Sequence, residues 1–396
     1  MYAACSGVRY AVLVLWLKKS LYGLKQTGRL WNQLLHRVLT KLGYTQGYAD
    51  SCLYKKRDAT GVTPVGVYVD DLLVTGTSEA CVDEFFSQMV VLKLKSLGVV
   101  SKFVGIGFVY DKESGWRLEQ RQAILELLEK FCLSSATPVR VPVGGEQEDE
   151  AEGELLQSGG RRTPAAADRA DIPVASRQSV VDCPLHQAGH RDCGAPGDPA
   201  LSCAATRRVA ACQGDRALLE GTLNFDFVMK ATPDGVIAGE VVLEAYSDAD
   251  YAGDRVDRKS VSGGVMLVGC MVVGWICKKQ ASISLSTMEA EFVAASQVTA
   301  EMFGIAELLK EIGVKVKDEY DLKVDNQAAI KQIKGENTSG RAKHIDIRYK
   351  FVKDLARKKA LRVVYCESKS MRSDILTKSM PAPRIEGLRG LVMLTP

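Results

Sequence analysis

Residues 284–295 read S-L-S-T-M-E-A-E-F-V-A-A, and apolar residues continue beyond them. This pattern predicts a long helix over Thr287–Ile312, with the hydroxyl of Ser286 or of the next residue as its N-cap. Glu289 and Glu291 fall at the start of that helix. Because residues two apart on a helix point to different faces, the two glutamates are expected to serve different purposes.

Short apolar segments on both sides of this helix predict the strands of one sheet. They are Val241–Tyr246, Ser262–Val268 and Met271–Lys278 before the helix, and Tyr320–Val324 and Leu361–Cys366 after it. Further helices are predicted over Asn326–Ile333, over the basic stretch Lys343–Arg357, and from Ser373 onward. Three strands, a helix, a strand, two helices, a strand and a last helix predict a mixed α/β (α+β) layer architecture.

Four acidic side chains stand at the ends of these elements. Asp248 is expected to follow the first strand, Glu291 opens the long helix, Asp325 ends the fourth strand and Asp374 opens the final helix. Carboxylates gathered in this way can share two divalent cations, which activate water for phosphodiester cleavage. Hard oxygen ligands favour Mg²⁺ or Mn²⁺.

The sequence words around these acids are more specific than the acids alone. Together they resemble, over about residues 221–380, the ribonuclease H domain of copia-type retrotransposon polyproteins. The words are Y-S-D-A-D-Y-A-G-D at 246–254, the opening stretch at 284–295, V-D-N-Q-A at 324–328, K-H-I-D at 343–346 and D-I-L-T-K at 374–378.

The resemblance implies that Asp248, Glu291, Asp325 and Asp374 are catalytic acids that bind metal. Glu291 is preferred over Glu289, which is expected to cap the helix or to form a salt bridge. The resemblance also implies substrate contacts from the basic helix, at Lys343, His344 and Arg348. His344 either guides the substrate or a proton, or merely orients that helix.

A second set of words resembles the palm of copia-type reverse transcriptases. Residues 68–71 read Y-V-D-D within a predicted strand, turn and strand over Val65–Val74. The resemblance implies that Asp70 and Asp71 hold catalytic metal at the tip of this hairpin. The supporting words are S-L-Y-G-L-K-Q-T-G-R-L-W-N at 20–32, A-D-S-C-L-Y at 49–54 and F-V-G-I-G at 103–107.

The word at 20–32 implies that Gly23 and Lys25 position the template and the incoming nucleotide. In the family this loop usually has Ala-Pro where Thr27-Gly28 stands here. The family also has a further catalytic aspartate upstream, in a segment reading roughly D-V-x-x-A-F-L, and nothing before Lys18 matches it. We therefore expect an N-terminally truncated palm whose RNA-directed DNA polymerase activity is at background.

The middle of the chain has a different composition. Residues 136–220 contain no Lys, Asn, Tyr, Phe or Trp, so we expect a poorly ordered segment. It is either a frame-shifted or degraded connection, or a divergent linker. Its one metal-like cluster, Cys183, His186, His190 and Cys193, is interpreted as coincidence because the usual C-x₂-C pair of zinc modules is missing.

The sequence therefore predicts four regions. They are a partial palm at 1–135, the middle segment at 136–220, a ribonuclease H-like domain at 221–380 and a tail at 381–396. Residues 1–49 hold seven Lys or Arg and no acid, and residues 341–396 hold fourteen against five acids. Basic ends favour RNA, DNA or an RNA–DNA hybrid as partner.

No membrane partner is expected, because the apolar run Ala11–Leu17 is far shorter than a bilayer span and is expected to be a strand. Eleven scattered cysteines suit a reducing interior. The family resemblance implies cytoplasmic virus-like particles, and no oligomeric state is predicted. The leading hypothesis is a hybrid-specific endoribonuclease. The alternatives are a non-catalytic nucleic-acid-binding remnant and an inactive pseudogene product.

Overall fold

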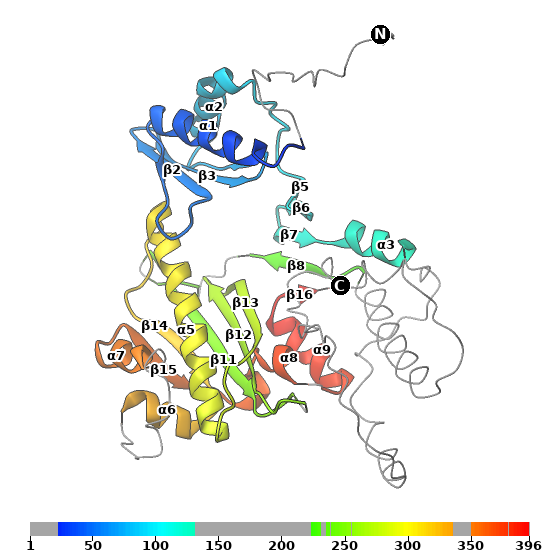
Figure 1. The fold of residues 1–396 in the computed structure, drawn as a ribbon, viewed down its shortest axis with the longest axis vertical. Coiled ribbons are helices and arrows are strands. Elements are labelled where there is room, and N and C mark those ends of the chain that lie inside the picture. The colour runs from blue at the N-terminus through cyan, green and yellow to red at the C-terminus, as the bar shows by residue number, and fades with distance from the viewer. Residues whose placement is uncertain are drawn as a thin grey trace, which may run out of the picture. The chain divides into compact units, whose positions relative to one another are not determined.

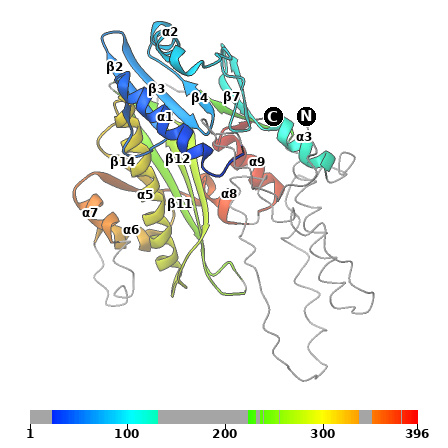
Figure 2. The ribbon, with the colours of Figure 1, turned by 45° about the horizontal axis from the view of Figure 1, so that its top comes forward.

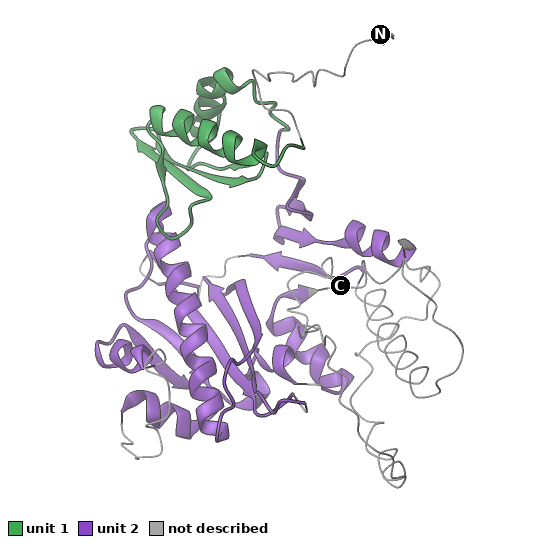
Figure 3. Ribbon diagram, viewed as in Figure 1, with its two compact units in different colours: residues 1–97 green, residues 98–396 purple. Residues whose placement is uncertain are grey.

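The computed structural model describes residues 23–130, 223–230, 235–237, 239–254, 256–335, 350–378 and 380–395. Most of the predicted middle segment, the predicted strand Ala11–Leu17 and the cysteine–histidine cluster at 183–193 lie outside these ranges. The chain forms two compact units, residues 1–97 and 98–396 (Figure 3).

Unit 1 is an antiparallel sheet with two helices (Figure 1). Its elements are α1 (Thr27–Lys41), β1 (Thr45–Gln46), β2 (Leu53–Asp58), β3 (Gly61–Tyr68), β4 (Asp71–Val74), α2 (Glu79–Gln88) and the 3₁₀ turn Met89–Leu92. The sheet order follows the chain, β1-β2-β3-β4. Leu35 and Leu39 of α1, one helical turn apart, pack with Phe85 of α2 in the core. The predicted strand, turn and strand over Val65–Val74 is confirmed by β3 and β4.

Unit 2 contains the mixed sheet that the sequence predicts. Its elements are β11 (Leu243–Asp250), β12 (Val261–Val268), β13 (Met271–Lys279), α5 (Thr287–Ile312), β14 (Tyr320–Val324), α6 (Gln327–Lys334), α7 (Phe351–Arg357), β15 (Leu361–Tyr365), the 3₁₀ turn Ser368–Ser370 and α8 (Asp374–Thr377). The sheet order is β13-β12-β11-β14-β15. The first three strands are antiparallel, and β14 and β15 run parallel to β11. The predicted mixed α/β architecture is confirmed.

Alternation along the strands divides the sheet into two buried faces. Leu243 and Ala245 of β11 pack with α5, α6 and α7, whereas Tyr246 packs with the segment that includes α8. Figure 2 shows α5 running along β11 and β12. Within the described residues, α5 is the one helix long and apolar enough to cross a bilayer, but its buried residues, such as Phe292 and Val298, belong to the core on this sheet.

A glycine pair lets helices approach both faces of β12. A Cβ at Gly263 would collide with Thr377, and a Cβ at Gly264 would collide with Val298 of α5. Gly263 is paired with Asp248 across the antiparallel ladder, so both residues face the segment around α8. Glycine at 263 thus brings the α8 region against the predicted metal ligand.

A second sheet of unit 2 joins segments from three parts of the chain. Its strands are β5 (Lys102–Phe103), β6 (Ile106–Asp111), β7 (Gly115–Glu119), β8 (Asp226–Met229) and β16 (Leu394–Thr395), in the order β16-β8-β7-β6-β5. Strands β6 and β7 form a hairpin around Gly115, with Tyr110 opposite Trp116. The remaining elements are α3 (Arg121–Lys130), the hairpin of β9 (Val236–Ile237) with β10 (Glu240–Val241), and α9 (Ala382–Leu391).

Two boundaries differ from the sequence-based division. The units separate after Leu97. Residues 98–130, which the sequence analysis placed in the palm, belong to unit 2, where their strands join β8 and β16 in the second sheet. The predicted tail at 381–396 contains α9 and β16, and its Leu388 is fully buried. Both differences come from strand pairing between segments more than 100 residues apart, such as β7 with β8, which local patterns do not encode.

Candidate active site

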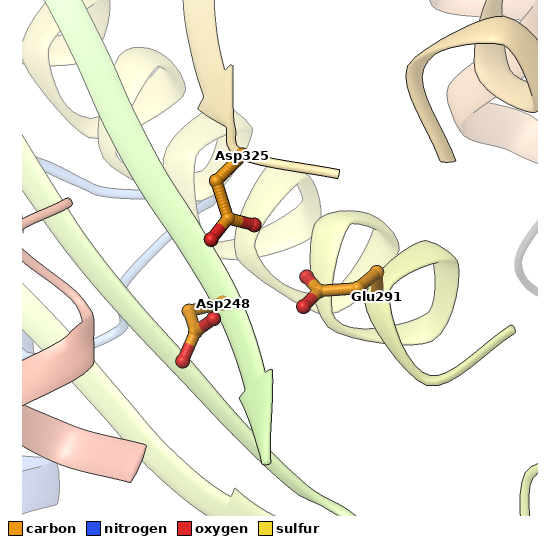
Figure 4. Close-up of side chains that lie close together, drawn as sticks. All are labelled: Asp248, Glu291 and Asp325. Atoms are coloured by element: carbon orange, nitrogen blue, oxygen red, sulfur yellow. The ribbon is translucent and has the colours of Figure 1, made fainter. Parts of the chain in front are cut away.

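Three of the predicted acids converge at one end of the mixed sheet. Asp248 comes from β11, Glu291 from the start of α5 and Asp325 from the residue after β14 (Figure 4). One carboxylate oxygen of each lies within 4.8 Å of the others. Figure 4 shows the three side chains turned toward one another.

The strand register explains why Asp248 and Asp325 meet. In the parallel pair of β11 and β14, Ser247 lies beside Val324. The next residue along the chain is an aspartate in both segments, and this brings Asp248 and Asp325 side by side. β11 extends to Asp250, so Asp248 lies within the strand. The sequence analysis expected Asp248 to follow the strand. Pairing with β12 extends β11, since Asp248 and Gly263 are register partners.

The two glutamates of α5 have different environments, as the helix geometry predicted. The Ser286 hydroxyl accepts a hydrogen bond from the Glu289 amide at 3.2 Å, which confirms the predicted N-cap. The Glu289 carboxylate accepts one from the Leu285 amide at 2.9 Å. Glu289 thus closes the start of the helix, and Glu291 is left to face Asp248 and Asp325.

Burial and like charge dominate the electrostatics of the group. Burial, followed by the negative charges of Asp248 and Asp325, raises the pKa of Glu291 to about 9. Burial, followed by the charge of Asp248, also raises the pKa of Asp325. Glu291 Oε2 is buried and has no hydrogen-bond partner among the described residues. A cation between these carboxylates would satisfy that oxygen and relieve the repulsion.

Asp374 lies outside this group of three and is bound by cationic side chains. Its Oδ1 accepts a hydrogen bond from Lys378 Nζ at 2.8 Å, and its Oδ2 accepts one from Arg384 at 3.1 Å. The same ammonium donates to Asp248 Oδ1 at 2.9 Å. Burial lowers the pKa of Lys378, but its hydrogen bond to Asp374 and the charge of Asp248 outweigh burial and raise the pKa overall. Asp374 is therefore linked to the group of three through Lys378.

The other predicted ligands, Asp70 and Asp71, lie in unit 1. Asp70 and Asp71 are exposed at the turn between β3 and β4, where Val69 adopts a φ of 52°. The indole of Trp31 in α1 donates a hydrogen bond to the Val69 carbonyl at 2.8 Å and holds the turn. Gly23 and Lys25 are exposed ahead of α1, with Gly23 at a φ of 89°. The predicted substrate residues Lys343, His344 and Arg348 lie outside the described residues.

Sequence reasoning missed three residues of the site. Thr377 donates a hydrogen bond to Asp248 Oδ2, and Lys378 and Arg384 bind Asp374. A signal existed for Lys378, because it stands four residues after Asp374, the spacing at which oppositely charged side chains meet on a helix. For Thr377 the 129-residue separation from Asp248 leaves no local signal.

Comparison with known proteins finds one matching family model and two similar polyproteins. Residues 11–144 match the family model described as reverse transcriptase (RNA-dependent DNA polymerase). The chain is 28% identical over 383 residues to the Retrovirus-related Pol polyprotein from transposon TNT 1-94 of Nicotiana tabacum, covering 95% of this chain and 28% of that protein. It is 27% identical over 380 residues to the corresponding polyprotein from transposon RE1 of Arabidopsis thaliana, covering 96% and 25%. The chain thus spans about a quarter of the length of these relatives.

Among solved structures, similarity is found to ribonucleases H. RNase H1 from Halobacterium salinarum NRC-1 aligns at 17% identity and a TM-score of 0.23, covering 34% of this chain and 93% of that chain. The N-terminal RNase H domain of rv2228c from Mycobacterium tuberculosis aligns at 14% identity and a TM-score of 0.26, covering 38% and 96%.

Proposed function

We propose that the C-terminal domain of this chain cleaves the RNA strand of RNA–DNA hybrids. The premise is the similarity of the chain to copia-type retrotransposon Pol polyproteins and its match to a reverse transcriptase family model. The observation that carries the proposal is the convergence of Asp248, Glu291 and Asp325 within 4.8 Å at the end of the mixed sheet. A group of buried like charges is costly unless something compensates it.

The residues present fit divalent cations. The site offers carboxylate oxygens, the donors that Mg²⁺ and Mn²⁺ prefer. Glu291 Oε2, unpaired among the described residues, is a ready ligand. Asp248, Glu291 and Asp325 would hold the cations, with Asp374 joining them. When bound, such cations activate a water molecule and stabilise the oxygen that leaves the phosphorus.

The chain's own residues orient this ligand set. Asp248 is fixed from one side by Thr377 and Lys378, and Glu291 approaches it from α5. Glu291 keeps its proton at neutral pH in the metal-free chain, and it would release that proton as a cation binds. The hybrid backbone is polyanionic, so Lys343, His344 and Arg348 are proposed as its contacts.

A second function is favoured by the family match over residues 11–144. We propose that Asp70 and Asp71 are the metal-binding pair of the reverse transcriptase domain, with Gly23 and Lys25 beside template and nucleotide. We also propose that the 396-residue chain alone does not polymerise DNA. Within the described ranges no third carboxylate joins Asp70 and Asp71, and nucleotide transfer needs two cations held in place. Primer extension on an RNA template with Mg²⁺, lost on Asp70→Asn, would contradict this.

The nuclease proposal is tested by cleavage of a labelled RNA–DNA hybrid. The full chain should cut the RNA strand with Mg²⁺ or Mn²⁺ and stop when the metal is chelated. Asp248→Asn should lower the rate by at least about 10²-fold, the loss typical of removing one preorganised electrostatic contact.

The matched control is Asp321→Asn. Asp321 lies in β14, forms an ion pair with Arg362 at 2.6 Å and is not part of the acid group. This variant should cut at the wild-type rate. Equal activity of wild type and Asp248→Asn would sink the proposal. Hybrid binding by a folded wild-type chain without metal-dependent cleavage would instead support the non-catalytic alternative.

A further inference from the structure

Lys378 lies on one side of the acid cluster, by which we mean Asp248, Glu291, Asp325 and Asp374. Its Nζ lies 2.9 Å from Asp248 Oδ1 and 2.8 Å from Asp374 Oδ1. Both partners are deeply buried, with side-chain exposures of 0% and 7%, whereas the lysine side chain is 38% exposed. One ammonium therefore neutralises two buried carboxylates, although the lysine side chain as a whole is partly exposed.

Hydrogen bonds divide the cluster into two unequal halves. Both oxygens of Asp248 are engaged, by Lys378 and Thr377, and both oxygens of Asp374 are engaged, by Lys378 and Arg384. On the other side, Glu291 is 7% exposed, and its Oε2 has no partner in the described part of the chain. Asp325 accepts a long hydrogen bond, 3.4 Å, from the Ser368 hydroxyl. The side of Glu291 and Asp325 is therefore the open one.

We propose that Lys378 is a built-in counter-cation, which fills the position between Asp248 and Asp374 and must leave before a divalent cation can use both of those carboxylates. This inference rests on the proposed metal site. It makes the two cation positions unequal: the first cation binds on the side of Glu291 and Asp325, and the second competes with Lys378. The Lys378 ammonium and a divalent cation would repel each other strongly between Asp248 and Asp374, so they do not occupy that position together.

A surface ion pair would not keep a divalent cation out of a binding position in this way. Pairs four residues apart on a helix, such as Asp374 with Lys378, are common and weak when exposed. Here the lysine also reaches Asp248, 130 residues away in the chain and fully buried. Removing one partner of a buried pair leaves an unpaired charge, which is costly. In the metal-free chain Lys378 is thus a positioning residue that holds the ligands of the second cation together.

The test is Mn²⁺ binding to the full metal-free chain, followed by the electron paramagnetic resonance signal of free Mn²⁺. Lys378→Met and Lys378→Gln remove the charge, and Gln retains a hydrogen-bond donor if Met impairs folding. Both should bind the second Mn²⁺ at least about tenfold more tightly than wild type, with the first Mn²⁺ little changed. Lys378→Arg, which restores the charge, should return the second affinity toward that of wild type.

Thermal unfolding supplies a second readout. Without metal, the two neutral variants should melt below wild type, and saturating Mn²⁺ should restore them. The control is Lys369→Met, whose exposed ammonium pairs with Glu367, and it should match wild type in both assays. A second Mn²⁺ that binds wild type and neutral variants equally, or binds none of them, overturns the role of Lys378. Absence of any Mn²⁺ binding by a folded wild-type chain overturns the proposed metal site itself.

Discussion

Arg384 of α9 lies 3.1 Å from the Asp374 carboxylate and donates a hydrogen bond to it. Its guanidinium also donates to the carbonyl of Lys369 at 2.5 Å and to that of Ser368. One residue of the region that the sequence analysis assigned to a tail therefore orients a predicted metal ligand and the turn before it. The C-terminal helix thus belongs to the domain that carries the acid group.

Truncation of a buried side chain in α9 should destabilise that domain. Leu388 is 0% exposed, so Leu388→Ala is expected to cost about 2–5 kcal/mol, the range for leucine in a core. Chemical denaturation of the full chain, followed by circular dichroism, measures the loss. Leu391 on the same helix is 37% exposed, and Leu391→Ala should change stability by less than half as much. Equal small effects of the two changes would contradict the packing of α9.

The two glutamates at the start of α5 should respond differently to the same substitution. Glu291→Gln removes a carboxylate of the acid group and should lower hybrid cleavage by at least about 10²-fold. Glu289→Gln should keep the wild-type cleavage rate, because a glutamine side chain can still accept the hydrogen bond from the Leu285 amide. Cleavage rates on a labelled hybrid decide the matter, and loss of activity in Glu289→Gln alone would reverse the assignment.

Metal affinity should depend on pH through Glu291. Its pKa is raised from 4.5 to about 9, so between those values the folded chain binds a proton that the unfolded chain lacks. The proton on Glu291 therefore stabilises the folded state, and this stabilisation is complete below about pH 4.5 and is lost as the pH rises through about 9.

A cation must displace the same proton, so affinity for Mn²⁺ should rise with pH toward about 9. Calorimetry in two buffers of different ionisation enthalpy would detect about one proton released at neutral pH. Glu291→Gln should remove that release. An affinity that stays flat between pH 6 and 9 would refute the expectation.

Adding one methyl group at Gly263 should disturb the site. The new Cβ would collide with Thr377 and lie 3.2 Å from the Ser373 carbonyl, so the α8 region must move away from Asp248. We expect a loss of about 1–3 kcal/mol, as for other overpacked positions, together with slower hybrid cleavage.

The matched control is Gly387→Ala in α9, where a Cβ meets nothing within 4 Å among the described residues. That change should stabilise the helix by about 0.5–1 kcal/mol. Both changes are compared by chemical denaturation. A Gly263→Ala chain as stable and active as wild type would show that the α8 region is not held closely against β12.

The turn that carries Asp70 should be strained at Val69. This β-branched residue has a φ of 52°, a left-handed conformation that costs roughly 1–2 kcal/mol. Val69→Gly should relieve the strain and stabilise unit 1 by about 1 kcal/mol or less, since glycine also loses more backbone entropy on folding. Slower amide hydrogen exchange in β3 and β4 would report the gain. Faster exchange there would mean that the valine side chain stabilises the turn.

The sequence alone determined the local elements and the identities of the acids. The span of α5, its Ser286 cap and the span of β14 follow from hydrophobic periodicity and end signals, which act over a few residues. The separate environments of Glu289 and Glu291 follow from helix geometry alone.

Only the tertiary structure decided which groups surround those acids. The pairing of β7 with β8, the extension of β11 through Asp248 and the contacts of Lys378 and Arg384 all join segments through packing or strand pairing. Asp248 and Lys378 are 130 residues apart, and no local preference encodes their contact. It exists because Gly263 admits the α8 region to the face of β12 beside Asp248, so that buried carboxylates and the ammonium compensate one another.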